Sequence, residues 1–141
     1  MYKDLERIAN NMRIDIINML SESKSGHPGG SLSACEIVAA LYFKEMNIDP
    51  RNPHWEDRDR FVLSKGHGAP VLYAALAERG YFPKEELNHL RKINSMLQGH
   101  PDMKGTPGVD MTTGSLGQGL AAANGMALAG KIDKKDYRVY A

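Results

Sequence analysis

Cysteine is nearly absent from this chain of 141 residues, because Cys35 is the only one. A single cysteine excludes an internal disulfide and a thiolate metal cluster. Cys35 follows Ala34 in a segment that we expect to be helical, with no adjacent basic group to lower the thiol pKa. We therefore predict that Cys35 is a small buried apolar side chain rather than a nucleophile.

An excess of one charge and a long apolar run are also missing. The formal net charge of +1 gives no basic face for general binding to nucleic acid or to a membrane surface. No apolar run approaches membrane-spanning length, and the charged residues 1–7 (MYKDLER) lack the apolar stretch of a signal peptide. We expect a cytoplasmic globular domain with no nucleic-acid or membrane partner.

Helical periodicity dominates the first part of the chain. Apolar residues from Leu5 to Met19 recur at helical spacing and predict an amphipathic helix. It should end before residues 25–30 (SGHPGG), where proline and glycine cannot continue it. Ser33 and Glu36 have the spacing of a capping box and predict the start of a second helix.

The middle and end of the chain alternate between strand and helix patterns. Residues 61–63 (FVL) predict a buried strand, and a helix should run from Pro70 to a stop at Gly80. Pro83 should open another short helix, and residues 94–113 have the composition of a long functional loop.

A helix rich in glycine and alanine follows over 117–130, and residues 137–141 (YRVYA) begin a strand. Each glycine weakens a helix, so this helix should closely approach a sheet, a ligand or another subunit. Strand–loop–helix order favours an α/β fold with parallel strands flanked by helices.

Three of the five histidines share one local context. His27, His67 and His100 each stand beside glycine in a predicted loop, where the backbone can approach a ligand and an imidazole can exchange a proton near neutral pH. One such histidine is more commonly a polar loop residue, but three favour a shared site at one cleft edge. Their separations of 40 and 33 residues match no short zinc-ligand spacing. His54 and His89 lack glycine neighbours and should lie on the surface.

Residues 112–119 (TTGSLGQG) form a second glycine cluster, before the glycine-rich helix. Free N–H groups at such a helix start can hold an anion or approach a flat ring. A dinucleotide fingerprint fits loosely at 117–122, a nucleophile elbow at 113–117 and a phosphate loop at 125–132, but each lacks a required residue or strand. Packing of a small-residue helix explains these near-matches equally well.

Four stretches together resemble the N-terminal part of transketolases. They are residues 25–30 (SGHPGG), 57–67 (DRDRFVLSKGH), 98–101 (QGHP) and 114–119 (GSLGQG), and their order and spacing match over essentially the whole chain. Residues 99–110 (GHPDMKGTPGVD) look closest to the N-terminal subunit of the split bacterial and archaeal form, in which two polypeptides share the work. Ser115 replaces the proline common in full-length enzymes, which fits the split form.

The resemblance implies a role for each matched residue. His27 and His100 would be catalytic residues that contact the sugar donor, and His67 would reach both the sugar and the cofactor diphosphate. The rings of thiamine diphosphate would be lined by Gly114, Ser115 and Leu116. Residues 1–141 would be the N-terminal portion of the thiamine-diphosphate domain, an incomplete α/β fold that ends before the magnesium motif.

The implied reaction is transfer of a two-carbon ketol unit from a ketose phosphate to an aldose phosphate through a thiamine diphosphate carbanion, as in the pentose phosphate pathway. The implied cofactors are thiamine diphosphate and Mg²⁺, with the metal ligands expected beyond this chain. The implied partners are sugar phosphates and a complementary C-terminal half within a homo- or hetero-oligomer, so the chain should be inactive alone. A deoxyxylulose-phosphate synthase, a non-catalytic assembly module that pairs through the glycine-rich helix, and an NAD-binding domain remain alternatives.

Overall fold

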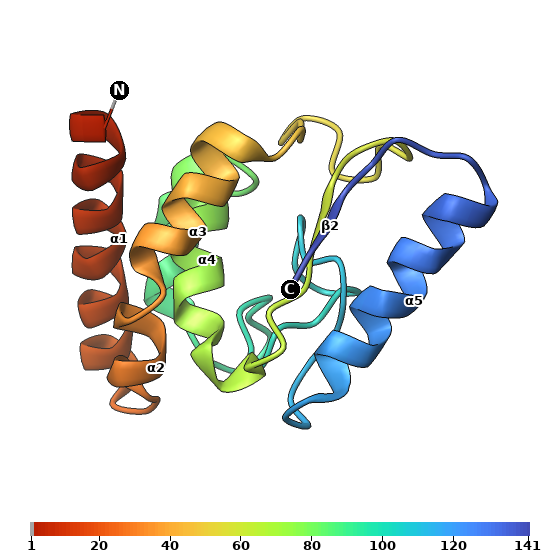
Figure 1. The fold of residues 1–141 in the computed structure, drawn as a ribbon. Coiled ribbons are helices and arrows are strands. Elements are labelled where there is room, and N and C mark those ends of the chain that lie inside the picture. The colour runs from red at the N-terminus through yellow and green to blue at the C-terminus, as the bar shows by residue number, and fades with distance from the viewer. Residues whose placement is uncertain (1) are drawn as a thin grey trace.

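A short parallel sheet lies between a layer of helices and a single helix on its other side (Figure 1). The computed structural model describes residues 2–141. In chain order the elements are α1 (Tyr2–Ser23), α2 (Pro28–Leu32), α3 (Cys35–Ala40), the π-helical η1 (Leu41–Glu45), β1 (Arg60–Phe61), the 3₁₀ turn η2 (Gly66–Gly68), α4 (Ala69–Arg79), the 3₁₀ helix η3 (Lys84–His89), α5 (Gln118–Ile132) and β2 (Val139–Tyr140). The α/β class with parallel strands is confirmed.

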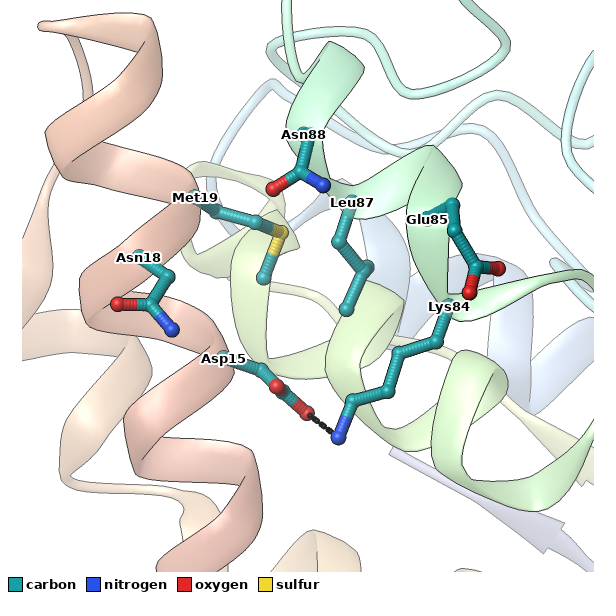
Figure 2. A pocket seen from close by; sticks show the side chains of 7 residues that line it. All are labelled: Asp15, Asn18, Met19, Lys84, Glu85, Leu87 and Asn88. Carbon is teal, nitrogen blue, oxygen red and sulfur yellow. Dashed lines mark ion pairs between the residues drawn. The ribbon is translucent and has the colours of Figure 1, made fainter.

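The amphipathic helix predicted near the N-terminus is α1. Its stripe of Met12, Ile16 and Met19 is fully buried in the core against α3 and α4. Asp15 lies on the same buried side, and its Oδ2 pairs with Lys84 Nζ of η3 at 3.0 Å. Figure 2 shows this ion pair beside a shallow pocket between α1 and η3. The apolar stripe of α1 therefore packs against other helices of the same chain.

The predicted capping box is wrong. The chain already turns into helix α2 at Pro28, so Ser33 caps the end of α2 instead of starting α3. Ala34 is the N-cap of α3, with no side-chain hydrogen bond. The Glu36 carboxylate does not reach back to the cap, because it pairs with the Arg13 guanidinium of α1.

Helix α4 confirms the predicted segment between Pro70 and Gly80. Proline lies in its first turn, and Gly80 ends it in the left-handed conformation at φ 92°. All nine residues from Ala69 to Ala77 are buried. This helix is the centre of the core, and it carries η2, with His67, at its N-terminal end.

The two strands pair in parallel, with Arg60 opposite Val139. The Arg60 N–H donates to the carbonyl of Arg138 at 2.9 Å. Buried Asp59 fixes the entry to both strands, because its carboxylate accepts the N–H of Asn47 at 2.8 Å and that of Arg138 at 2.7 Å. The first strand therefore begins one residue before the predicted run of 61–63.

Helix α5 confirms the predicted glycine–alanine helix. It packs along β2 on the side of the sheet away from α1 and α4 (Figure 1). Leu120, Leu128 and Ile132 remain largely exposed on it. Within residues 2–141, no helix combines the length and apolarity needed to cross a membrane.

Candidate functional site

The three glycine-flanked histidines come together in space. The ring centroids of His27 and His67 lie 5.9 Å apart, and those of His67 and His100 lie 4.6 Å apart, both pairs edge to face. All three imidazoles are exposed to solvent, whereas His54 and His89 lie on the surface elsewhere. The predicted convergence of the three is confirmed.

Each histidine is held by a different element. His27 is the N-cap of α2, with extended backbone at φ −122°. His67 lies in η2, which joins β1 to the start of α4. His100 follows Gly99 in the long irregular segment and precedes the buried Pro101. Residues far apart in sequence therefore meet where the N-termini of two helices approach each other.

The side chain of Tyr73 holds the backbone at His100 in place, and the sequence analysis did not identify this residue. Its ring is fully buried in α4, and its hydroxyl lies 2.8 Å from the carbonyl of Gln98 and 3.0 Å from that of His100. The hydroxyl donates to these oxygens and fixes the backbone on both sides of Gly99. Tyr73 lies in the otherwise apolar run from Ala69 to Ala77, so only its polar atom in a core position could have revealed this role.

Gly66 allows the second glycine cluster to reach the histidines. A Cβ at Gly66 would lie 2.8 Å from the backbone of Thr113 and Gly114, so a larger residue would force the two segments apart. The Cβ position of Gly114 lies 3.4 Å from the His100 ring. Thr113 is buried, and its Oγ1 has no hydrogen-bond partner among residues 2–141. Residues 113–114 therefore form one wall beside the imidazoles.

The predicted ring-lining residues divide between two cavities. Gly114 and Ser115 line one of about 520 Å³ at the N-terminal end of α5. Leu116 lines a separate apolar cavity of about 440 Å³ with Leu63 and Lys65. The structure therefore places Gly114 beside the histidines and turns Leu116, which is largely exposed, toward the strand end.

The site is electrostatically biased toward anions. Partial burial lowers the pKa of His100, and the neighbouring His67, Arg91 and His27 lower this pKa further. A lowered pKa keeps the His100 imidazole neutral and able to accept a proton at neutral pH. The positive charge of Arg91 beside His100 favours a negatively charged ligand.

These residues fit thiamine diphosphate in part. Close glycine backbone, an unpartnered buried hydroxyl and clustered imidazoles suit a flat ring and a diphosphate. Among residues 2–141, no group of three or more histidine, cysteine, aspartate or glutamate side chains could hold a metal ion. The dinucleotide alternative fails, because the fingerprint requires a strand that leads directly into the helix, whereas η3 is the element before α5 in the described chain.

The fold and this wall of glycine and histidine define an α/β cofactor-binding domain. Residues 5–139 match the family described as transketolase, thiamine diphosphate binding domain. The chain belongs to this transketolase family.

Named relatives and solved structures agree with this assignment. A 6-deoxy-6-sulfo-D-fructose transketolase subunit of a Clostridium species is 56% identical and aligns with 97% of this chain and 50% of its own length. Mouse transketolase is 54% identical over 96% of this chain and 22% of its own. The transketolase structure from Leishmania mexicana superposes with a TM-score of 0.86 at 41% identity, over 89% of this chain and 19% of that one. The chain thus spans half or less of the length of these relatives.

Proposed function

We propose that this chain supplies cofactor- and sugar-binding residues to a transketolase that transfers a two-carbon ketol unit between sugar phosphates. The meeting of His27, His67 and His100 beside Gly114 carries the proposal. Residues 1–141 would form the N-terminal portion of the thiamine-diphosphate domain. The Mg²⁺ ligands would lie outside these residues. The setting would be cytoplasmic.

In this proposal each residue has a defined task. His67, in the middle of the cluster, donates a hydrogen bond to the cofactor diphosphate and contacts the sugar. His27 and His100 contact the sugar donor, and neutral His100 can take a hydroxyl proton as the carbon–carbon bond breaks. Gly114, Ser115 and Leu116 line the thiamine rings, with Leu116 reaching them from its separate cavity. When bound, thiamine diphosphate supplies the stabilisation of the carbanion formed by that cleavage.

The remaining machinery belongs to a partner in the proposal. A complementary C-terminal half would cover the exposed histidines and exclude water, within a homo- or hetero-oligomer. The exposed apolar residues of α5 support such an association, because a large apolar helix face is costly in water.

The names of two related proteins include a sugar with an anionic group. One is a 6-deoxy-6-sulfo-D-fructose transketolase subunit, and a Pichia stipitis transketolase that is 38% identical was solved with sedoheptulose 7-phosphate. We therefore propose a ketose with a terminal phosphate as the donor, and a terminal sulfonate is the second arm of the test.

The test is ketol transfer by this chain, extended through the magnesium motif and mixed with its C-terminal half, thiamine diphosphate and Mg²⁺. His67→Ala should lower kcat/KM by about 10- to 100-fold, because it removes a hydrogen bond to the charged diphosphate and a contact with the sugar. His54→Ala, an exposed histidine outside the cluster, is the matched control and should leave the rate unchanged. A folded complex without activity on either donor would contradict the proposal and favour an assembly module.

A further inference from the structure

We propose that Arg91 is a positioning residue of the candidate site, which ties the loop bearing His27 to the loop bearing His100. This inference rests on the proposed function, because Arg91 positions binding and catalytic residues only if the three histidines form that site. The contacts themselves come from the structure alone.

Arg91 contacts both loops through one guanidinium group. Its Nη1 donates to Ser25 Oγ at 2.6 Å, two residues before His27. The rest of the guanidinium lies against Gly99, next to His100. A Cβ at Gly99 would come within 3.1–3.2 Å of Arg91 Nε, Cζ and Nη2. Glycine at position 99 therefore lets the guanidinium lie directly against the backbone, where a side chain would push it back by a few tenths of an ångström.

The backbone around Arg91 is shaped to present this side chain. Arg91 adopts a left-handed conformation at φ 61°, which is uncommon for a residue with a Cβ. Its N–H donates to the carbonyl of Leu97 at 2.8 Å and closes the turn that leads to Gly99. Strain of this kind persists where surrounding contacts over-determine it, and it clusters at functional sites.

The charge of Arg91 is not neutralised by an acid. No carboxylate among residues 2–141 lies within ion-pair distance of its guanidinium. Neighbouring Lys92, by contrast, pairs with Glu22 of α1 at 3.1 Å. Arg91 therefore holds the two loops and also adds positive charge beside His100, which helps to lower the pKa of His100 together with burial, His67 and His27.

Lys92 provides a matched control. It is the next residue, it is also a long cation, and it also ties this segment to the end of α1. Within residues 2–141, its ammonium group makes no hydrogen bond or ion pair with either histidine loop. Arg91→Met and Lys92→Met each remove one exposed cation, so a difference in loop mobility between them reports the bridge, whereas a difference in the His100 pKa reports the position of the Arg91 charge.

The experiment is histidine-ring NMR titration and backbone ¹⁵N relaxation on the chain with Arg91→Met, Arg91→Lys and Lys92→Met. Arg91→Met should raise the pKa of His100 and lower the order parameters of residues 25–27 and 99–100 from about 0.85 to below about 0.6, because the two loops lose their link. Arg91→Lys keeps the charge but lacks the planar fork, so it should preserve the His100 pKa and still lower the order parameters. Lys92→Met should change neither quantity.

Equal behaviour of Arg91→Met and Lys92→Met would overturn the proposal. If Arg91→Met does not fold, Ser25→Ala tests the same bridge, because it removes the hydroxyl that accepts the hydrogen bond from Arg91 Nη1. Unchanged order parameters at residues 25–27 in that variant would also overturn it. A partnered enzyme without ketol transfer would contradict the proposed function and leave these results standing, so the two failures are distinguishable.

Discussion

Helices α4 and α5 have similar small, apolar compositions but opposite surroundings. All nine residues from Ala69 to Ala77 of α4 are buried, enclosed by α1, α3 and η3. In α5 the only buried residues are Gly119, Ala123 and Gly130, all on the side toward the sheet. The two helices lie on opposite sides of that sheet (Figure 1).

The difference shows what an apolar helix does and does not specify. Composition requires that both helices be covered, but only α4 has its cover within residues 2–141. The small alanine and glycine residues of α5 leave little side-chain bulk on its surface, so another helix could approach it closely. This contrast supports the proposal that a partner chain completes the molecule on the α5 side.

The largest expected effect is a difference in the free energy of unfolding between a leucine-to-alanine variant in α4 and one in α5. Leu76→Ala empties a fully buried position and should lower the free energy of unfolding by about 2–5 kcal/mol. Leu128→Ala, at a position that is 59% exposed, should change it by less than about 0.5 kcal/mol. Urea unfolding of both variants measures the difference.

Equal losses in the two leucine variants would mean that α5 is already covered in solution, by a second copy of the chain. Repeating the unfolding at several protein concentrations would then reveal that association, because the midpoint of a dimer depends on concentration.

A smaller effect compares two tyrosine hydroxyls. Tyr73→Phe removes the donor shared by the carbonyls of Gln98 and His100 and should cost about 1–2 kcal/mol, with a shift of the His100 ring resonances. Tyr137→Phe removes a 3.2 Å bond to the carbonyl of Met126, within helix α5. It should cost less, because that carbonyl lies in a helical segment with backbone donors. A costlier Tyr137→Phe would contradict the view that α4 carries the site.

Apolar periodicity and the positions of proline and glycine predicted most of the fold, because each of these signals is local in the sequence. The stripe of α1, the span from Pro70 to Gly80 and the parallel strands all appear in the structure. The capping box failed because Pro28 starts a helix earlier and Arg13 captures Glu36, a contact between distant segments.

The residues of the candidate site also differ in whether local sequence signals could identify them. Glycine context identified His27, His67 and His100, and the structure confirms their convergence. Tyr73 and Arg91 could not be found, because the first resembles a core aromatic residue and the second a surface cation. Their roles depend on long-range contacts with Gln98 and Ser25, which no sequence spacing encodes.

The smallest expected effect is a pH dependence of stability, and it involves the ion pair between Asp15 of α1 and Lys84 of η3. Burial raises the pKa of Asp15 and Glu78 raises it further, while Lys84 lowers it, with a net upward shift from the ordinary 3.8. A carboxyl whose folded pKa exceeds its unfolded value contributes stability below the unfolded pKa and loses it as pH rises through the folded pKa. Asp15→Asn should therefore be less destabilising at about pH 7 than at about pH 4.

Lys84→Met sharpens this last prediction. Without the ammonium group shown in Figure 2, the pKa of Asp15 should rise further, and the loss of stability between about pH 4 and about pH 7 should be larger than in the wild type. The double variant with Asp15→Asn should remove most of that extra loss. Urea unfolding at both pH values measures all four proteins. A Lys84→Met variant with the pH dependence of the wild type would show that water, rather than Lys84, already stabilises the Asp15 carboxylate.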